Sequence, residues 1–321
     1  MAPTAGQEEW ATGSTIRPIL TRLAEFARFS HLTITLEGES GTGKSRLARW
    51  VHSASSRAHA PFVEVDTGAI DDQLAGSELF GHVAGAFTGA THARSGLLAS
   101  ANRGTLFLDE VGKATLHLQK RILNLLERRT ARPVGGDREV TYDVRFVVAT
   151  NVSLEDLTAR AELLPDLLPR LSGFRVRVPP LRERRADIPL LAHAILDKHA
   201  ALFGYHALPD IAPELSEALS KCDWPYNIRE LDNVVQRILV AARGASTLTL
   251  EHCRDEDLLF VRQVALGSVE RQVTPAIAAE AVKKSRSIAQ AARDLGVARS
   301  TVQRQLRRHD HGFQSDTQEA V

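Results

Sequence analysis

Two short stretches of this sequence carry residues that could bind and hydrolyse a nucleotide. The first is GESGTGKS at residues 38–45, which follows a strand-like run and opens a helical pattern. Glycines at these spacings let backbone N–H groups turn towards phosphate oxygens, while Lys44 can reach the β- and γ-phosphates and Ser45 can hold Mg²⁺. The nucleotide-binding residues expected from the pattern are Gly38, Glu39, Ser40, Gly41, Thr42, Gly43, Lys44 and Ser45.

The second stretch is GTLFLDE at residues 104–110, an apolar run that ends in two acids. At the end of a buried strand, Asp109 would lie beside the Mg²⁺ held by Ser45, and Glu110 could orient and activate water for attack on the γ-phosphate. Two acids can also simply cap a strand in solvent, but the phosphate loop independently requires such a partner. We therefore expect ATP and Mg²⁺ as cofactors, with Lys44, Asp109 and Glu110 as catalytic residues.

The elements around these stretches indicate an α/β core. Strand-like runs at 32–37, 61–65, 105–108 and 144–150 alternate with helical patterns, including LHLQKRILNLLERR. Such alternation is typical of a parallel sheet covered by helices on both faces. Residues 189–252 are predicted as helices without a strand, with LPDIAP as a linker between them.

Composition and charge place further limits on function. The net charge is +1, no run approaches the ~18 apolar residues needed to span a bilayer, and the first residues lack the pattern of a secretory signal. We expect a cytoplasmic protein without membrane insertion, in which Cys222 and Cys253 are buried free thiols. Residues 274–309 carry eight basic and two acidic residues, a net of +6, which points to a nucleic-acid module.

A third stretch, GAFTGA at residues 85–90, belongs to neither a helix nor a strand. Gly81, Gly85 and Gly89 recur at four-residue spacing, which would destabilise a helix, and the small residues would make a poor strand. We expect a loop tip whose Phe87 and Thr88 contact a partner.

Together these motifs resemble the AAA+ transcriptional activators that act on the sigma-54 form of bacterial RNA polymerase. The likeness runs from about Thr12 to Arg308 and is carried by GESGTGK, GTLFLDEVG, SELFGH followed by GAFTGA, VVATN at 147–151, PPLRER at 179–184 and WPYNIREL at 224–231. It implies an AAA+ P-loop NTPase core with an α-helical lid, assembled into a hexameric ring. It also implies that Gly85, Ala86, Phe87, Thr88, Gly89 and Ala90 contact the sigma factor.

The resemblance assigns three further residues to the nucleotide site. Asn151 would sense the γ-phosphate, Arg229 would act as a second sensor from the lid, and Arg170 would be an arginine finger that reaches a neighbouring subunit. A trans-acting arginine makes physical sense because it supplies stabilising charge only when subunits assemble.

The sequence departs from the family pattern at several positions. Leu163 and Leu164 stand where Phe-Arg is usual, so one expected arginine is missing. Asp66 replaces an Asn that restrains the catalytic Glu in the family, and an Asp side chain has no N–H to donate. Tyr226 stands where Gly is common, and Ser45 where the family often has an acidic residue. We expect activity with altered regulation.

The C-terminal segment SIAQAARDLGVARSTVQRQLRRH is predicted to form a helix-turn-helix of the Fis-like type found in the same family. Its second helix would enter the major groove of DNA, where Arg and Gln suit guanine and adenine edges. A basic amphipathic hairpin is the alternative. The DNA-binding residues expected are Arg299, Ser300, Thr301, Gln303, Arg304 and Arg307.

The resulting domain assignment is a leader (1–11), an α/β subdomain (12–180), a helical lid (181–254), a linker (255–273), the helix-turn-helix (274–309) and a tail (310–321). The function expected is an ATP-hydrolysing activator that binds upstream promoter DNA and opens sigma-54 polymerase complexes. One alternative is an ATP-binding but weakly hydrolysing DNA-binding co-regulator or subordinate subunit of a mixed ring. Another is an AAA+ machine that acts on another partner. Because the leader is too short for a receiver domain, we expect control by expression level, a separate inhibitor or a co-activator protein.

Overall fold

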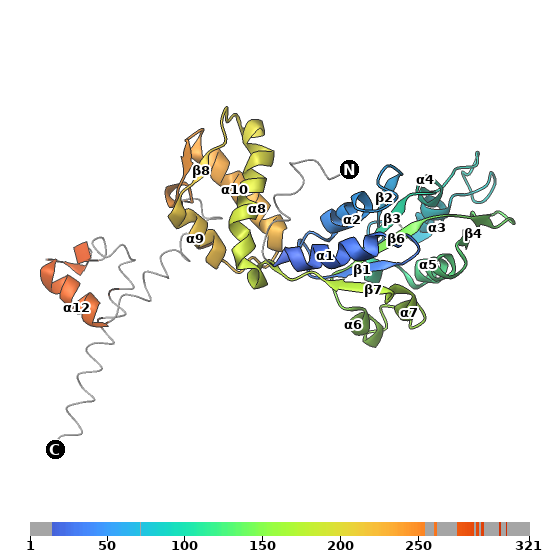
Figure 1. Ribbon diagram of the computed structural model, residues 1–321, viewed down its shortest axis with the longest axis horizontal. Coiled ribbons are helices and arrows are strands. Elements are labelled where there is room, and N and C mark those ends of the chain that lie inside the picture. The colour runs from blue at the N-terminus through green and yellow to red at the C-terminus, as the bar shows by residue number, and fades with distance from the viewer. Residues whose placement is uncertain are drawn as a thin grey trace, which may run out of the picture. The chain divides into compact units, whose positions relative to one another are not determined.

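The computed structural model describes residues 15–70, 72–253, 260–261, 275–285, 287–288, 290–291, 302 and 306 (Figure 1). These residues fall into two compact units. The first comprises those within Met1–Ala194 and Trp224–Asp232, and the second those within Ile195–Asp223 and Asn233–Val321.

A parallel sheet forms the centre of the first unit. Its strands are β1 (Ile34–Glu37), β2 (Phe62–Asp66), β3 (Thr105–Asp109), β6 (Arg145–Thr150) and β7 (Phe174–Arg177), in the order β2-β3-β6-β1-β7. The central strands β3 and β6 are largely apolar because both faces of the sheet are covered there, whereas β1, β2 and β7 include polar or charged residues. The predicted strands are confirmed, whereas β7 was not predicted.

Helices cover the sheet on both faces. Two of them, α1 (Ile16–Ala27) and α2 (Lys44–Ser53), contact each other, and α2 contacts β1, β3 and β6. The other face is covered by α3 (Asp72–Phe80), α4 (Leu97–Ser100), α5 (Leu116–Arg128), α6 (Leu154–Ala159) and α7 (Leu167–Leu171), whose apolar residues share one core cluster with Leu106 and Leu108 of β3. Figure 1 shows α2 and α7 on opposite sides of the strands.

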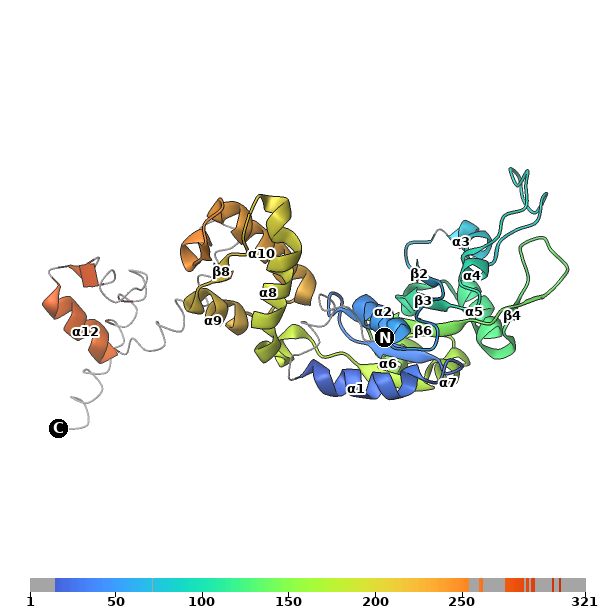
Figure 2. The same ribbon diagram turned by 45° about the horizontal axis from the view of Figure 1, so that its top comes forward.

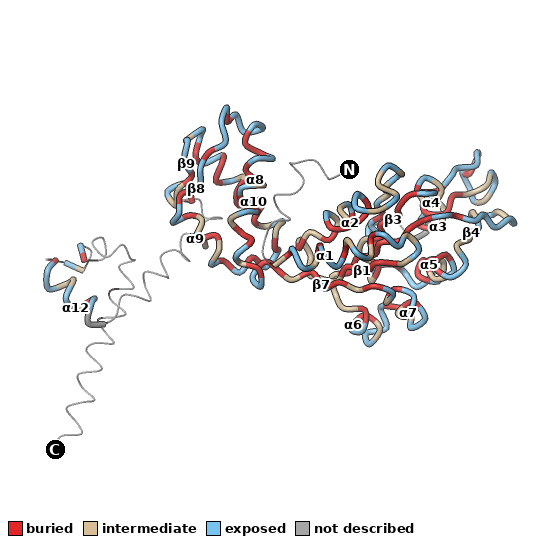
Figure 3. The backbone as a smooth tube through the Cα atoms, viewed as in Figure 1, coloured by how far each residue is buried: buried red, intermediate tan, exposed pale blue. Residues whose placement is uncertain are grey.

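Two loops extend beyond the sheet on the side of α3 and α4 (Figure 2). The first follows α3, and the second lies between the short antiparallel strands β4 (Thr130–Ala131) and β5 (Val140–Thr141). The sheet is mostly buried, whereas both loops carry long exposed stretches (Figure 3). The described residues of this unit also form the 3₁₀ turns η3 (Val111–Lys113), η4 (Leu181–Glu183) and η5 (Arg185–Asp187).

The second unit is mainly helical. It contains α9 (Pro213–Lys221) and the later parts of α8 (Ile188–His199) and α10 (Asn227–Ala242), with the 3₁₀ turns η6 (Ala200–Phe203) and η7 (Leu250–His252). The prediction of no strand was wrong, because β8 (Asp210–Ile211), within LPDIAP, pairs in parallel with β9 (Thr247–Leu248). Two residues per strand are too few to show an alternating pattern in the sequence. Cys222 and Cys253 are both buried, and neither forms a disulfide.

The described part of the C-terminal region contains α12 (Pro275–Lys284). Ala278 and Val302 are buried together, and Val282, Ile288 and Leu306 pack against them. The predicted DNA-contacting residues, which are Arg299, Ser300, Thr301, Gln303, Arg304 and Arg307, lie outside the described residues, as does most of the predicted helix-turn-helix.

Candidate functional site

The glycine-rich segment 38–43 connects β1 to the N-terminus of α2. Gly41 and Gly43 have φ of +78° and +99°, a backbone region that other residues rarely adopt. The hydroxyl of Thr42 donates to the carbonyl of Glu39 at 2.8 Å and closes the turn. The segment therefore has the conformation of an anion-binding loop, in which backbone N–H groups and the N-terminus of a helix point towards the anion.

Lys44 is the first residue of α2, and its side chain is buried. The ammonium donates to the carbonyls of Gly38 (2.6 Å) and Glu39 (3.1 Å), which keeps it against the loop. Burial lowers the pKa of Lys44, and the nearby charges of Asp109 and Glu110 oppose that shift. A phosphate bound in the loop would add negative charge beside this buried cation and further favour its charged form.

Ser45 and Asp109 meet where α2 begins and β3 ends. The Ser45 hydroxyl donates to Oδ2 of Asp109 at 3.2 Å, and Oδ1 of Asp109 accepts from the Glu110 N–H at 2.9 Å. Two oxygens this close are the hard ligands that Mg²⁺ prefers, with phosphate oxygens and water filling the other positions. No cluster of three acids, histidines or cysteines suited to a metal occurs in the described part of the chain.

Glu110 directly follows β3 and has φ of +56°, an uncommon conformation for a residue with a side chain. The Thr67 hydroxyl, at the end of β2, lies 2.9 Å from the carbonyls of both Asp109 and Glu110 and donates to them. Sequence reasoning missed Thr67, which braces this turn from the neighbouring strand. Strain held in place by such a contact is common at functional sites.

The two sensor candidates lie near the same loop. Asn151 follows β6, the strand between β1 and β3, so it lies at the sheet edge that carries the phosphate loop and Asp109. Arg229, in α10, donates from Nη1 to the Ser40 hydroxyl at 3.0 Å. The structure thus brings Arg229 directly onto the phosphate loop.

Arg170 is not brought to the phosphate loop of its own chain. It lies in α7 and pairs with Glu127 of α5, with Nε and Nη2 at 3.0 and 2.9 Å from Oε1 of Glu127. About half of its side chain is exposed (54%), which leaves it accessible to another molecule.

Three residues around the loop were not singled out from the sequence, although they lie in the quoted motifs PPLRER and WPYNIREL. Asn227 is fully buried, accepts from the Leu181 N–H at 2.7 Å, and donates to the carbonyl of Ser40 at 2.9 Å. Arg182 donates to the carboxylate of Glu39 and lowers its pKa. Arg184 is buried and donates to the carbonyl of Thr42 at 2.7 Å.

Two of the departures have a visible structural setting. Asp66 is exposed, and its Oδ1 accepts from the Gly68 N–H at 2.9 Å, so this carboxylate closes its own turn. Leu164 packs against the core cluster, and its N–H donates to Oε1 of Gln119 at 2.8 Å. Neither side chain supplies the N–H group or positive charge that the family pattern places there.

The GAFTGA segment forms a hairpin tip that is closed by a bond from the Gly85 N–H to the carbonyl of Ala90 at 2.7 Å. Thr88 is exposed, as is 41% of Phe87, whose ring edge rests on His82 with centroids 5.0 Å apart. Reciprocal bonds between His82 and Arg94 form the stem of the hairpin.

The second loop supports this stem. The Val83 N–H donates to the carbonyl of Val134 at 3.1 Å, and the Val134 N–H donates to the carbonyl of Gly81 at 2.8 Å. The two loops are therefore joined at their bases by backbone hydrogen bonds.

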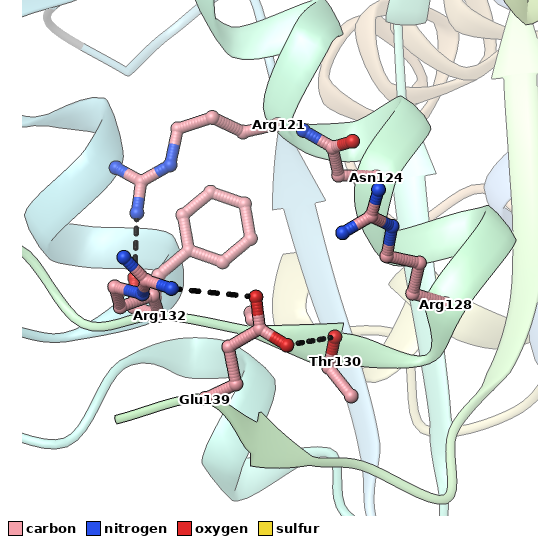
Figure 4. Close-up of a pocket in the computed structure, with 8 residues that line it drawn as sticks. Arg121, Asn124, Arg128, Thr130, Arg132 and Glu139 are labelled. Carbon is pink, nitrogen blue, oxygen red and sulfur yellow. Dashed lines mark hydrogen bonds and ion pairs between the residues drawn. The ribbon is translucent and has the colours of Figure 1, made fainter. Parts of the chain in front are cut away.

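A cavity of about 270 Å³ lies beneath the second loop and is rich in arginine (Figure 4). Arg121 of α5 stacks on the ring of Phe80, with Cζ 4.2 Å from its centroid, and donates to the carbonyl of Arg132 at 2.8 Å. Arg132 in turn pairs with Glu139 at 3.5 Å. These contacts tie the end of α3, helix α5 and the base of the second loop together.

Comparison with known proteins identifies both parts of this architecture. The family model of the sigma-54 interaction domain matches residues 12–177, and that of the AAA+ ATPase lid domain matches residues 182–258. The putative uric acid sigma-54-dependent transcriptional regulator UacR of Escherichia coli is 35% identical over 92% of this chain and 52% of its own length. The Nif-specific regulatory protein of Herbaspirillum seropedicae is 43% identical over 67% of this chain and 40% of its own length.

Among solved structures, NtrX of Brucella abortus in complex with ATP superimposes with a TM-score of 0.69 at 29% identity, over 96% of this chain and 69% of that one. The chain spans about half the length of the curated relatives it matches. In the described residues, no helix is both long and apolar enough to cross a membrane.

Proposed function

This chain belongs to the family of AAA+ regulators that carry the sigma-54 interaction domain, and on that premise we propose that it is an ATP-hydrolysing transcriptional activator. In this proposal the chain assembles into a ring in which Arg170 reaches the neighbouring subunit. It binds upstream promoter DNA through residues 274–309, and it converts closed sigma-54 RNA polymerase complexes into open ones. One observation carries the proposal: the GAFTGA hairpin, with Phe87 and Thr88 exposed, rises from the same unit that holds the phosphate loop, Asp109 and Glu110.

In the hydrolysis step, Lys44 and the backbone N–H groups of 38–45 would hold the β- and γ-phosphates. Ser45 and Asp109 would hold Mg²⁺, which when bound neutralises charge on the phosphate oxygens. Glu110 would accept a proton from the attacking water. Asn151 and Arg229 would read the γ-phosphate, and Arg170 of one subunit would stabilise the transition state in the site of the next.

The coupling to the polymerase would pass through the GAFTGA hairpin. A Phe side chain buries a large apolar area on a partner, and glycines on either side allow the tip to change conformation. The residues proposed to contact the sigma factor are Gly85, Ala86, Phe87, Thr88, Gly89 and Ala90.

A second candidate is supported by the settings of Asp66 and Leu164. If Leu164 removes a needed charge and Asp66 a needed switch, the chain would bind ATP but hydrolyse it weakly as a subordinate subunit of a mixed ring. The ATP hydrolysis rate of the isolated protein separates the two candidates.

The test of the main proposal is promoter opening by purified protein with sigma-54 polymerase and ATP. Thr88→Ala and Phe87→Ala should abolish opening while the ATP hydrolysis rate stays within about twofold, because both side chains lie away from the phosphate loop. The matched control is Thr91→Ala, an exposed residue just beyond the hexapeptide. Full opening by Thr88→Ala would contradict the proposal and would favour an AAA+ machine with another partner.

A further inference from the structure

Glu110, the proposed general base, has one carboxylate oxygen in an unusual position. Its Oε2 is buried and has no hydrogen-bond partner, and only 14% of the side chain is exposed. A buried carboxylate oxygen without a donor is costly unless a positive charge lies nearby. The charge that meets it is Lys113, whose Nζ lies 3.5 Å from Oε2.

The other lysine of the site does not fill this role. Lys44 donates to the carbonyls of Gly38 and Glu39 and is held against the phosphate loop. Lys113 is therefore the lysine that pairs with the buried Oε2 of Glu110.

Lys113 is itself placed by its surroundings. It ends η3, and its backbone N–H donates to the carbonyl of Glu110 at 2.7 Å. Its aliphatic stem lies over Gly68, where an added Cβ would come within 2.9 Å of Lys113 Cδ and 3.1 Å of Lys113 Cβ. Gly68 is fixed in turn by its bond to Asp66, so the turn after β2 leaves room for the lysine.

We propose that Lys113 is a positioning residue that fixes the orientation of the Glu110 carboxylate, an inference that rests on the ATP hydrolysis proposed above. The side chain of Lys113 is largely exposed (59%), so solvent screens its charge, whereas the side chain of Glu110 is only 14% exposed. Lys113 therefore acts on hydrolysis through the direction of the carboxylate, and removing it lowers the rate of hydrolysis in addition to any stability cost of leaving the buried Oε2 without a nearby positive charge.

The first experiment compares ATP hydrolysis by Lys113→Met, Lys113→Arg and the unaltered protein. Lys113→Met should lower kcat roughly tenfold with little change in KM for ATP, because misaligning a catalytic group slows the reacting step. Lys113→Arg should restore most of the rate, since a guanidinium can keep the pair. The matched control is Lys120→Met, an exposed lysine of α5, which should behave as the unaltered protein.

A second variant, at Gly68, disturbs the position of Lys113 without changing the lysine itself. Gly68→Ala should displace the lysine stem and lower kcat as well, and the double variant with Lys113→Met should be no slower than Lys113→Met alone, because both remove one interaction. A kcat within twofold of the unaltered protein in Lys113→Met, or a raised one, would overturn the inference. A rise in KM with an unchanged kcat would do so too.

Carbodiimide labelling of carboxylates, read by mass spectrometry without nucleotide, tests the inference independently of turnover. Glu110 should react several-fold faster in Lys113→Met than in the unaltered protein or in Lys120→Met, and equal labelling would count against the role of Lys113. If the unaltered protein hydrolyses no ATP at any concentration, the proposed function fails, and the labelling result still decides whether Lys113 orients Glu110.

Discussion

The phosphate loop and the GAFTGA hairpin are both rich in glycine, but the glycines meet opposite surroundings. A Cβ added at Gly41 would collide with the backbone carbonyl of Tyr226, and φ there is +78°. At Gly85 and Gly89, where φ is +80° and +98°, an added Cβ would have no atom within 4 Å. One loop is enclosed by the chain around it, and the other stands open.

This difference indicates what each loop is built for. The enclosed loop is fixed by Asn227, Arg184 and Arg229 around a single geometry, which suits a site that must hold phosphates in one arrangement. The open hairpin is held by short-range bonds at its stem and across its tip, and the empty space around Gly85 and Gly89 leaves room for the tip to change conformation against a partner.

The largest expected effect lies at the enclosed site. Glu110→Gln should lower the ATP hydrolysis rate by roughly 10²–10⁴, because it removes the proposed proton acceptor. ATP binding should persist, since Lys44 and the phosphate loop are unchanged. Binding by fluorescent nucleotide and turnover by phosphate release check both parts, and equal loss of binding and turnover would show that Glu110 has a structural role instead.

A pair of glycine substitutions tests the comparison itself. Gly41→Ala should cost about 2–5 kcal/mol of folding stability, because left-handed strain and overpacking add. Gly89→Ala, its matched control in open space, should cost only about 1–2 kcal/mol from strain. The thermal unfolding midpoints of both variants measure the difference, and equal midpoints would break the distinction between enclosed and open loops.

The next largest effect is expected at Asn227, whose buried side-chain amide links the Leu181 N–H to the phosphate loop. Asn227→Ala should cost about 1–3 kcal/mol, because the Leu181 N–H and the Ser40 carbonyl both lose a buried partner. The binding constant for ATP should weaken as well. Titration with ATP alongside thermal unfolding checks this, with Asn124→Ala, an exposed position on α5, as the control.

The smallest effect concerns the base of the open loops. Arg121→Met should destabilise the loop bases by about 1 kcal/mol, from a lost stacking contact and one hydrogen bond. Hydrogen exchange at the Val83 and Val134 amides, which join the two loops, should then speed up roughly fivefold. Unchanged exchange would show that the arginine contacts in Figure 4 do not support these loops.

The core of the fold was predictable where local pattern and chemistry agree. The runs that became β3 and β6 are largely apolar, those that became β1 and β2 alternate apolar with polar residues, and the phosphate loop has a fixed glycine spacing. β7 was missed because FRVR carries two arginines in four residues, one of which pairs with Glu37 and Glu155 across elements. Pairs of this kind are set by tertiary contacts that no local pattern reveals.

The candidate site shows the same division. The positions of Lys44, Ser45, Asp109 and Glu110 follow from motifs, whereas Thr67 and Asn227 act through bonds to residues far away in the sequence. Lys113 was also missed, since its part depends on the left-handed turn at Glu110 and on the space above Gly68. Contacts of this kind depend on the tertiary structure, which brings together residues that no local sequence pattern connects.

The most direct test of the account is the ATP hydrolysis rate per subunit, measured over a wide range of protein concentration for the unaltered protein and for Arg170→Ala. An active ring with a trans-acting arginine predicts a rate that climbs as subunits assemble and collapses in Arg170→Ala, while Arg128→Ala, an exposed arginine of α5, keeps it. A negligible rate at every concentration, or full activity in Arg170→Ala, would contradict the account.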